Sequence, residues 1–153
     1  MILDTPTLLE RTSSDPAVVA LLGTLGIAQP IKPPKRDQEY RGVEAKAYGI
    51  ALNFSRAEDL DLPGMQDLPE GTLVVSTVFL FAERVQKHRQ YQGALPHGLK
   101  FGMSRDQVRT LLGEPHWTSP MLPVDRWHYD GYRLAVNFDD CGVMTYLSVG
   151  LPR

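Results

Sequence analysis

One short amphipathic helix occurs twice in this sequence, and the repetition constrains the fold more than any other feature. In the second copy, MSRDQVRTLLGEP, Ser104 and Gln107 have the spacing of a capping box. Gly113 and Pro115 then stop the helix. The pattern predicts a helix over 104–112, which is too short to be stable unless it packs on other elements.

The first copy, SSDPAVVALLG, lies 90 residues earlier and has the same construction. We expect Ser14 to cap this helix and Gly23 to end it. In each copy three apolar residues at helical spacing form one stripe. The stripes are Val18, Leu21 and Leu22 in the first copy and Val108, Leu111 and Leu112 in the second.

The segments after each helix have the alternation of β-strands. Asp130-Gly131, between Tyr129 and Tyr132, is typical of a two-residue hairpin turn, and YGIALNF after the first helix matches YRLAVNF after the second. We expect strands at 41–46, 49–55, 71–82, 125–129, 132–138 and 143–149. The order helix, strand, strand, strand therefore occurs twice. It predicts an α+β protein of two tandem units, each a short helix packed on an antiparallel β-sheet of about three to four strands.

The units are predicted at 1–92 and 93–153, and the first contains an acidic insert at 57–70. Side-chain alternation should give each sheet one apolar face, which the helix covers, and one polar face open to water. The apolar face is predicted to carry Trp127, Tyr129, Tyr132, Leu134, Val136 and Phe138. The open face is predicted to carry Arg126, His128, Arg133 and Asn137, with Asn53 in the equivalent position of the first unit.

Composition excludes several classes of function. The net charge of −2 over 153 residues offers no basic excess for nucleic acid or an anionic membrane surface. The four histidines and Cys141 lack the spacings of a metal site or a nucleophilic centre. We therefore expect no metal, no cofactor and no catalytic residues. The single cysteine, and the lack of a leader-like apolar run after Asp4, favour a cytoplasmic location.

The segment GMSRDQVRTLLGEP, followed by WHYDGYRLAVNF, resembles the repeat unit of the β-lactamase inhibitory protein family and of the small outer-membrane-assembly lipoproteins. The resemblance covers 98–149 and, more loosely, 13–82. The tandem arrangement is similar to that of the inhibitor family. It implies binding through the open face of the sheet and its loops, without catalysis. A cytoplasmic protein of this kind resembles a bacterial immunity protein.

The sequence thus favours a non-enzymatic inhibitor that neutralises a cognate toxin. The predicted contacts are Trp117, Arg126, His128, Arg133, Asn137 and Asn53, with Glu58, Asp59 and Asp61 of the insert docking on a basic surface of the toxin. Two alternatives stay open. One is a small hydrolase-like enzyme using His128 with Cys141 or with carboxylates, and the other is a secretion or assembly adaptor.

Overall fold

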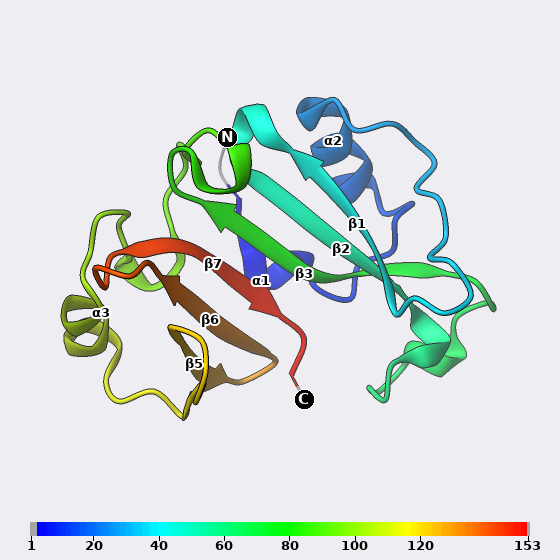
Figure 1. Ribbon diagram of the computed structural model, residues 1–153. Helices are drawn as coiled ribbons and strands as arrows, with labels where there is room; N and C mark the ends of the chain where they lie inside the picture. The colour runs from blue at the N-terminus through cyan, green and yellow to red at the C-terminus, as the bar shows by residue number, and fades with distance from the viewer. Residues whose placement is uncertain (1–2, 153) are drawn as a thin grey trace.

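The computed structural model describes residues 3–152, and within them seven antiparallel strands form one continuous sheet. The order of the strands is β1-β2-β3-β7-β6-β5-β4 (Figure 1). Their bounds are β1 Tyr40–Ala45, β2 Ile50–Arg56, β3 Leu73–Phe81, β4 Trp117–Thr118, β5 Val124–Tyr129, β6 Tyr132–Phe138 and β7 Met144–Gly150. The predicted strands are thus present with shifts of one or two residues at their ends, and Tyr129 pairs with Tyr132 as the hairpin signal requires.

The prediction of two tandem helix-on-sheet units is wrong. The two three-stranded segments join edge to edge, because β3 pairs with β7 from Thr77↔Gly150 to Phe81↔Tyr146. Separate sheets would each leave an unpaired row of backbone N–H and C=O groups on the inner strand, and joining the strands removes both rows. The repetition of local elements therefore builds one sheet. The division of the chain at 92/93 stays a prediction.

The helices pack on one face of this sheet, over an apolar core that extends beneath both halves of the described chain. It runs from Val18 and Leu22 at one end to Trp127 and Leu134 at the other. Figure 1 shows α1 behind β3 and β7. The helices are α1 Thr5–Leu8, α2 Pro16–Leu25 and α3 Arg105–Leu112, and short 3-10 turns lie at Lys46–Tyr48, Ala57–Asp59, Met65–Asp67, Val85–Lys87 and Pro96–Gly98.

The predicted ends of the first helix need correction. Asp15, not Ser14, is the N-cap of α2, and its side chain accepts a hydrogen bond from the backbone N–H of Ala17. The helix continues through Gly23 and ends at Gly26, which has a φ of 71°. A glycine inside a helix costs about 1 kcal/mol, and the extra turn buries Leu25 in the core. Burial of that side chain offsets the cost.

The second helix begins and ends where the sequence predicts, with a complete capping box between Ser104 and Gln107. Its buried face differs from the prediction, because Leu111 is 47% exposed and only Val108 is fully buried. The face toward the sheet also carries Arg105 and Arg109, which are four residues apart and so lie on the same side of the helix. The contacts of Arg105 and Arg109 with the sheet therefore replace the apolar contact that was predicted for Leu111.

The insert 57–70 packs on the face of the sheet opposite the helices. Ala57 and Met65 cover Val74 of β3 there, and three partly buried leucines complete this small second core: Leu60, Leu62 and Leu68. The insert, predicted from its carboxylates as a charged docking segment, is thus also anchored by its apolar residues.

Candidate protein-binding face

We use the term open face for the side of the sheet that carries no helix. Residues paired across antiparallel strands point to the same side of a sheet, so the strand registers define its rows. The first row crosses the sheet from β1 to β4 and consists of Glu44, Ala51, Phe79, Ser148, Ala135, Arg126 and Trp117. The second row runs beside it and consists of Gly42, Asn53, Thr77, Gly150, Arg133 and His128.

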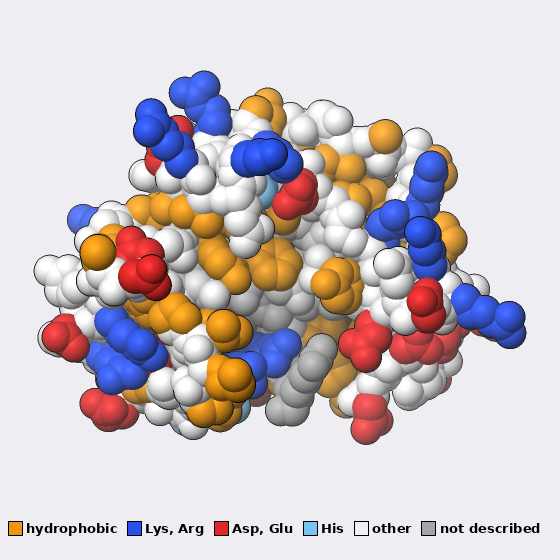
Figure 2. All heavy atoms as spheres, in the orientation of Figure 1, with side chains coloured by type: hydrophobic (Ala, Val, Ile, Leu, Met, Phe, Trp, Pro, Cys, Tyr) orange, Lys and Arg blue, Asp and Glu red, His pale blue; other side chains and the backbone are white. Residues whose placement is uncertain are grey.

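Small residues occupy several inner positions of both rows, and Phe79 of β3 is the large apolar residue among them. Ala51, Ser148 and Ala135 occupy inner positions of the first row, whereas Glu44 and Trp117 occupy its ends. Figure 2 shows apolar side chains across the middle of this face, with basic and acidic ones gathered toward its margins. A surface with an apolar centre and a charged rim is the arrangement that protein interfaces share.

At the β4 end, two of the predicted contact residues lie against each other. The guanidinium of Arg126 stacks over the ring of Trp117, with its central carbon 4.4 Å from the ring centroid. Trp117 is 40% exposed. The sequence predicted both residues as contacts, but their stacking follows from the β4–β5 register, which the sequence did not reveal.

The second row brings Arg133 and His128 together as neighbours on β6 and β5. Gly150 leaves space beside Arg133, since a Cβ on Gly150 would lie 3.4 Å from the Arg133 Nε. The ring of His128 stacks on His116 at a centroid distance of 5.4 Å. Asn53 lies three strands from Arg133, or roughly 14 Å at the usual strand spacing. The predicted contacts on the sheet therefore share one face but do not form one cluster.

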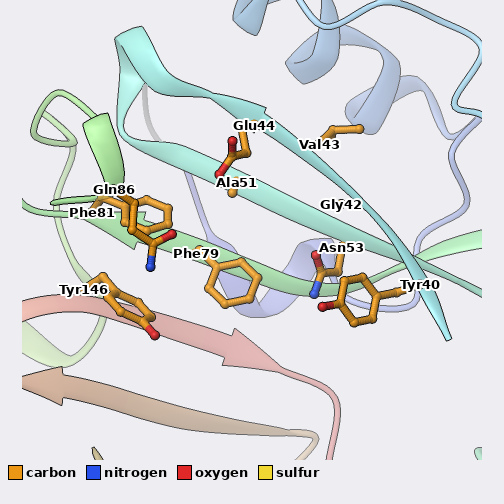
Figure 3. A pocket seen from close by; sticks show the side chains of 10 residues that line it. All are labelled: Tyr40, Gly42, Val43, Glu44, Ala51, Asn53, Phe79, Phe81, Gln86 and Tyr146. Atoms are coloured by element: carbon orange, nitrogen blue, oxygen red, sulfur yellow. The ribbon is translucent and has the colours of Figure 1, made fainter. Parts of the chain in front are cut away.

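A hollow of about 300 Å³ opens at the other end of this face (Figure 3). Most of the residues that line it were not predicted as contacts, although Asn53 was. The lining consists of Tyr40, Gly42, Val43, Glu44, Ala51, Asn53, Phe79, Phe81, Gln86 and Tyr146. The Tyr146 phenol, whose pKa burial raises from an ordinary value already far above neutral pH, is protonated and able to donate a hydrogen bond.

Stacked aromatic rings form one wall of the hollow. Phe81 lies 3.8 Å from the His88 ring and 5.4 Å from the Tyr146 ring, measured between centroids. Phe79 stacks beside Phe81 at 6.3 Å. One signal for this cluster is present in the sequence: from Val78 to Phe81, β3 has apolar residues on both of its faces, which indicates that its outer face is also partly covered.

The loop after β3 is held tightly against this wall. Arg84, Gln86 and Lys87 have positive φ angles of 67°, 49° and 66°, and non-glycine residues in that region persist only where surrounding contacts enforce them. Here the backbone N–H of Arg89 donates to the carbonyl of Lys46 at 2.8 Å, and that of Tyr91 donates to the carbonyl of Phe81 at 3.0 Å. The loop therefore places Gln86 in the lining of the hollow and buries the His88 ring against Phe81.

On the helix side, the buried carboxylate of Asp125 fixes the elements beneath the β4 end of the open face. Arg105 and Arg109 of α3 each donate two hydrogen bonds to it, at 2.7–3.0 Å, and the Thr118 hydroxyl of β4 donates one at 2.9 Å. Burial alone would raise the pKa of this carboxyl, but these donors outweigh it and hold the pKa well below the usual range. Asp125 thus joins α3 to β4, the strand that carries Trp117.

The three predicted acidic contacts lie on the insert, away from Trp117; Figure 1 shows the insert and β5 on opposite sides of the molecule. Glu58 accepts a hydrogen bond from the backbone N–H of Gly71 at 2.8 Å, and Asp59 lies 3.5 Å from Arg56. Asp61 is exposed. Two of these carboxylates therefore have structural contacts inside the first half of the chain.

The structure does not bring His128 and Cys141 together. His128 lies at the β5–β6 hairpin, and Cys141 lies in the turn after the far end of β6. The length of β6 separates them by roughly 20 Å. Within residues 3–152, no three histidine, cysteine or acidic side chains are grouped so as to hold a metal ion. The same part of the chain has no helix long and apolar enough to cross a membrane.

Comparison with known families matches a segment in the second half of the chain. Residues 97–147 match the outer membrane protein assembly factor BamE domain. This segment includes α3, β4, β5, β6 and most of β7, so a third of the chain resembles that domain. No match was found among curated proteins. Among solved structures, a DUF4309 family protein (YjgB) from Bacillus subtilis matches with 16% identity and a TM-score of 0.44, over 88% of this chain and 77% of that one.

The match to the BamE domain supports one of the two resemblances seen in the sequence, that to outer-membrane-assembly lipoproteins. It contradicts the predicted cytoplasmic location, because the matched family is described as an outer membrane protein assembly factor. That prediction depended on one unpaired cysteine and on the first residues of the chain, and neither determines a compartment. Nothing in the comparisons supports a toxin-immunity function.

Proposed function

We propose that this protein is a non-enzymatic adaptor in outer membrane protein assembly, which binds a protein partner through its open face. The observation that carries the proposal is the match of residues 97–147 to the BamE domain. Among the alternatives that the sequence left open, the match favours the assembly adaptor.

The geometry of the open face is consistent with a protein partner. The matched segment supplies one end of this face, including Trp117 with Arg126 stacked on it, and Arg133 beside His128. Tryptophan and arginine are the side chains most often found at the energetic centre of protein interfaces. Small residues between them and the hollow leave room for a partner segment to lie across the strands.

Site-specific photo-crosslinking in the native host tests the proposal. A photoreactive residue at Ser148, in the middle of the first row, is expected to crosslink to a component of the outer membrane assembly machinery. The same residue at Thr24, an exposed position on α2 on the helix side, is the matched control and is expected to give no such product.

Loss of the gene is expected to lower the amount of assembled outer membrane proteins, measured in isolated outer membranes. Equal crosslinking from Ser148 and Thr24, or products from Ser148 that contain only cytoplasmic proteins, would contradict the proposal.

A further inference from the structure

The hollow at the β1 end of the open face has a composition that selects a particular kind of side chain. Four of the residues that line it are aromatic: Tyr40, Phe79, Phe81 and Tyr146. Glu44 is the one charged side chain among the described residues of the lining. Aromatic faces and a carboxylate both attract cations, and together they exclude anions.

The carboxylate of Glu44 lacks a close partner of its own. Its contacts with cationic groups in the described chain are long, at 3.8 Å to the Lys46 ammonium and 3.9 Å to the ring of His88. Both Glu44 and Lys46 have half-exposed side chains. The exposed Lys46 ammonium can turn away into water at little cost, so Glu44 is free to accept hydrogen bonds from an incoming group.

His88 adds a second acceptor beside that carboxylate. Its Nδ1 lies 3.2 Å from the carbonyl oxygen of Val85 and 3.1 Å from that of Gln86. Carbonyl oxygens only accept, so in the neutral ring Nδ1 carries the proton and Nε2 is left as an acceptor. Nε2 is buried, has no hydrogen-bond partner in the described chain, and faces Glu44. Glu44 and His88 therefore place two acceptors side by side, with the Lys46 ammonium 3.8 Å from the carboxylate as a loosely held donor.

We propose that this hollow binds a basic side chain, arginine or lysine, from the protein partner. The existence of that partner rests on the proposed function. The aliphatic stem lies against Phe79 and Tyr146, and the cationic head donates to the carboxylate of Glu44. Arg126 and Arg133 lie at the opposite end of the face, so the Glu44 carboxylate and these two guanidiniums orient a partner that carries a basic side chain at one end and acidic ones at the other.

Nuclear magnetic resonance titration of the full chain with small probes tests this inference. The probes are N-acetyl-arginine methylamide, the lysine equivalent, and N-acetyl-citrulline methylamide, which has the shape of the arginine probe without its charge. The arginine or the lysine probe is expected to shift the backbone signals of Glu44, Asn53, Phe79 and Tyr146, and whichever binds more tightly identifies the preferred side chain. The citrulline probe is expected to bind roughly tenfold more weakly, because it lacks a charge-assisted hydrogen bond.

Two variants test the roles of charge and ring. Glu44→Gln is expected to remove the preference for arginine over citrulline, whereas Glu70→Gln, an exposed carboxylate of the insert, is expected to leave it unchanged. Phe79→Leu keeps an apolar side chain but removes the ring, and is expected to weaken binding of the cationic probe roughly two- to fivefold. Unfolding curves confirm that each variant is folded before titration.

Equal binding of the arginine and citrulline probes, or an absence of shifts at the hollow with both cationic probes, would overturn the inference. Its failure is distinguishable from failure of the proposed function. Crosslinking from Ser148 to an assembly component without cation binding would refute only the hollow as a basic-residue site. Cation binding without such a crosslink would refute only the adaptor role in assembly.

Discussion

Helices α2 and α3 share a sequence pattern but dock on the sheet by different means. The ten residues of α2 include no charged side chain, and four apolar ones are buried: Val18, Leu21, Leu22 and Leu25. The eight residues of α3 bury Val108 fully and Leu112 in part, and Arg105 and Arg109 bind the buried Asp125. Similar spacing of apolar residues thus does not imply similar docking. The sheet offers α3 the buried carboxylate of Asp125, so ion pairs form there, whereas α2 lies on apolar side chains.

The largest expected effect is on α3. Replacing both Arg105 and Arg109 with alanine leaves the buried Asp125 carboxylate without a cation, and is expected to lower the free energy of unfolding by about 3–5 kcal/mol. Urea denaturation followed by circular dichroism measures it. The control is Arg36→Ala, an exposed arginine, with an expected change within about 0.5 kcal/mol. A loss in the double variant no larger than the control's would mean that the ion pairs do not hold α3.

The comparison is sharpened by the matching positions Leu21 and Leu111, which lie 90 residues apart. Leu21 is buried in the core, so Leu21→Ala is expected to cost about 2–5 kcal/mol of unfolding free energy. Leu111 is half-exposed, and Leu111→Ala is expected to cost under about 1 kcal/mol. Equal losses of unfolding free energy in the two variants would show that Leu21 and Leu111 pack alike, which would contradict the structure.

The two helices should also differ in their response to pH. Asp125 has a pKa lowered in the folded protein, so its contribution to stability is present above the pKa of the unfolded chain, about 3.9, and is lost as pH falls through the folded pKa. At neutral pH, Asp125→Asn is expected to lower the unfolding free energy by about 1–3 kcal/mol. The gap between wild type and variant should stay constant down to about pH 5 and narrow below about pH 4, as measured by urea midpoints. If the difference in unfolding free energy between wild type and Asp125→Asn grew on acidification, the assigned direction of the Asp125 pKa shift would be wrong.

The smallest expected effect on stability concerns Trp117, on the strand that Asp125 fixes. Trp117→Ala removes the stacking with Arg126 and is expected to cost under about 1 kcal/mol of unfolding free energy. Its effect on crosslinking from Ser148 should be much larger, because an exposed tryptophan contributes to an interface more than to the folded chain. Undiminished crosslinking in the double variant Trp117→Ala with Arg133→Ala would exclude this end of the face from the interface.

The sequence predicted the local elements of this protein well. The capping box of α3, the Asp130-Gly131 hairpin and the alternation in β5 and β6 all hold in the structure. Each depends on residues within a few positions of one another, so the chemistry is contained in a short segment. The predicted placement of Arg126, His128, Arg133 and Asn137 on one face holds for the same reason, whereas the aromatic residues that β3 and β7 add to that face were not predicted.

The tertiary structure decided how those elements combine. The pairing of β3 with β7 joins segments about 70 residues apart, and no local pattern encodes which strand edges meet. The Asp125 carboxylate lies under α3 because of that helix's docking, and the hollow takes residues from β1, β2, β3, β7 and a loop. Contacts between distant segments depend on the whole chain's packing, so the sequence defined the elements of the binding face and the fold alone brought Glu44, Phe79 and Tyr146 to one place.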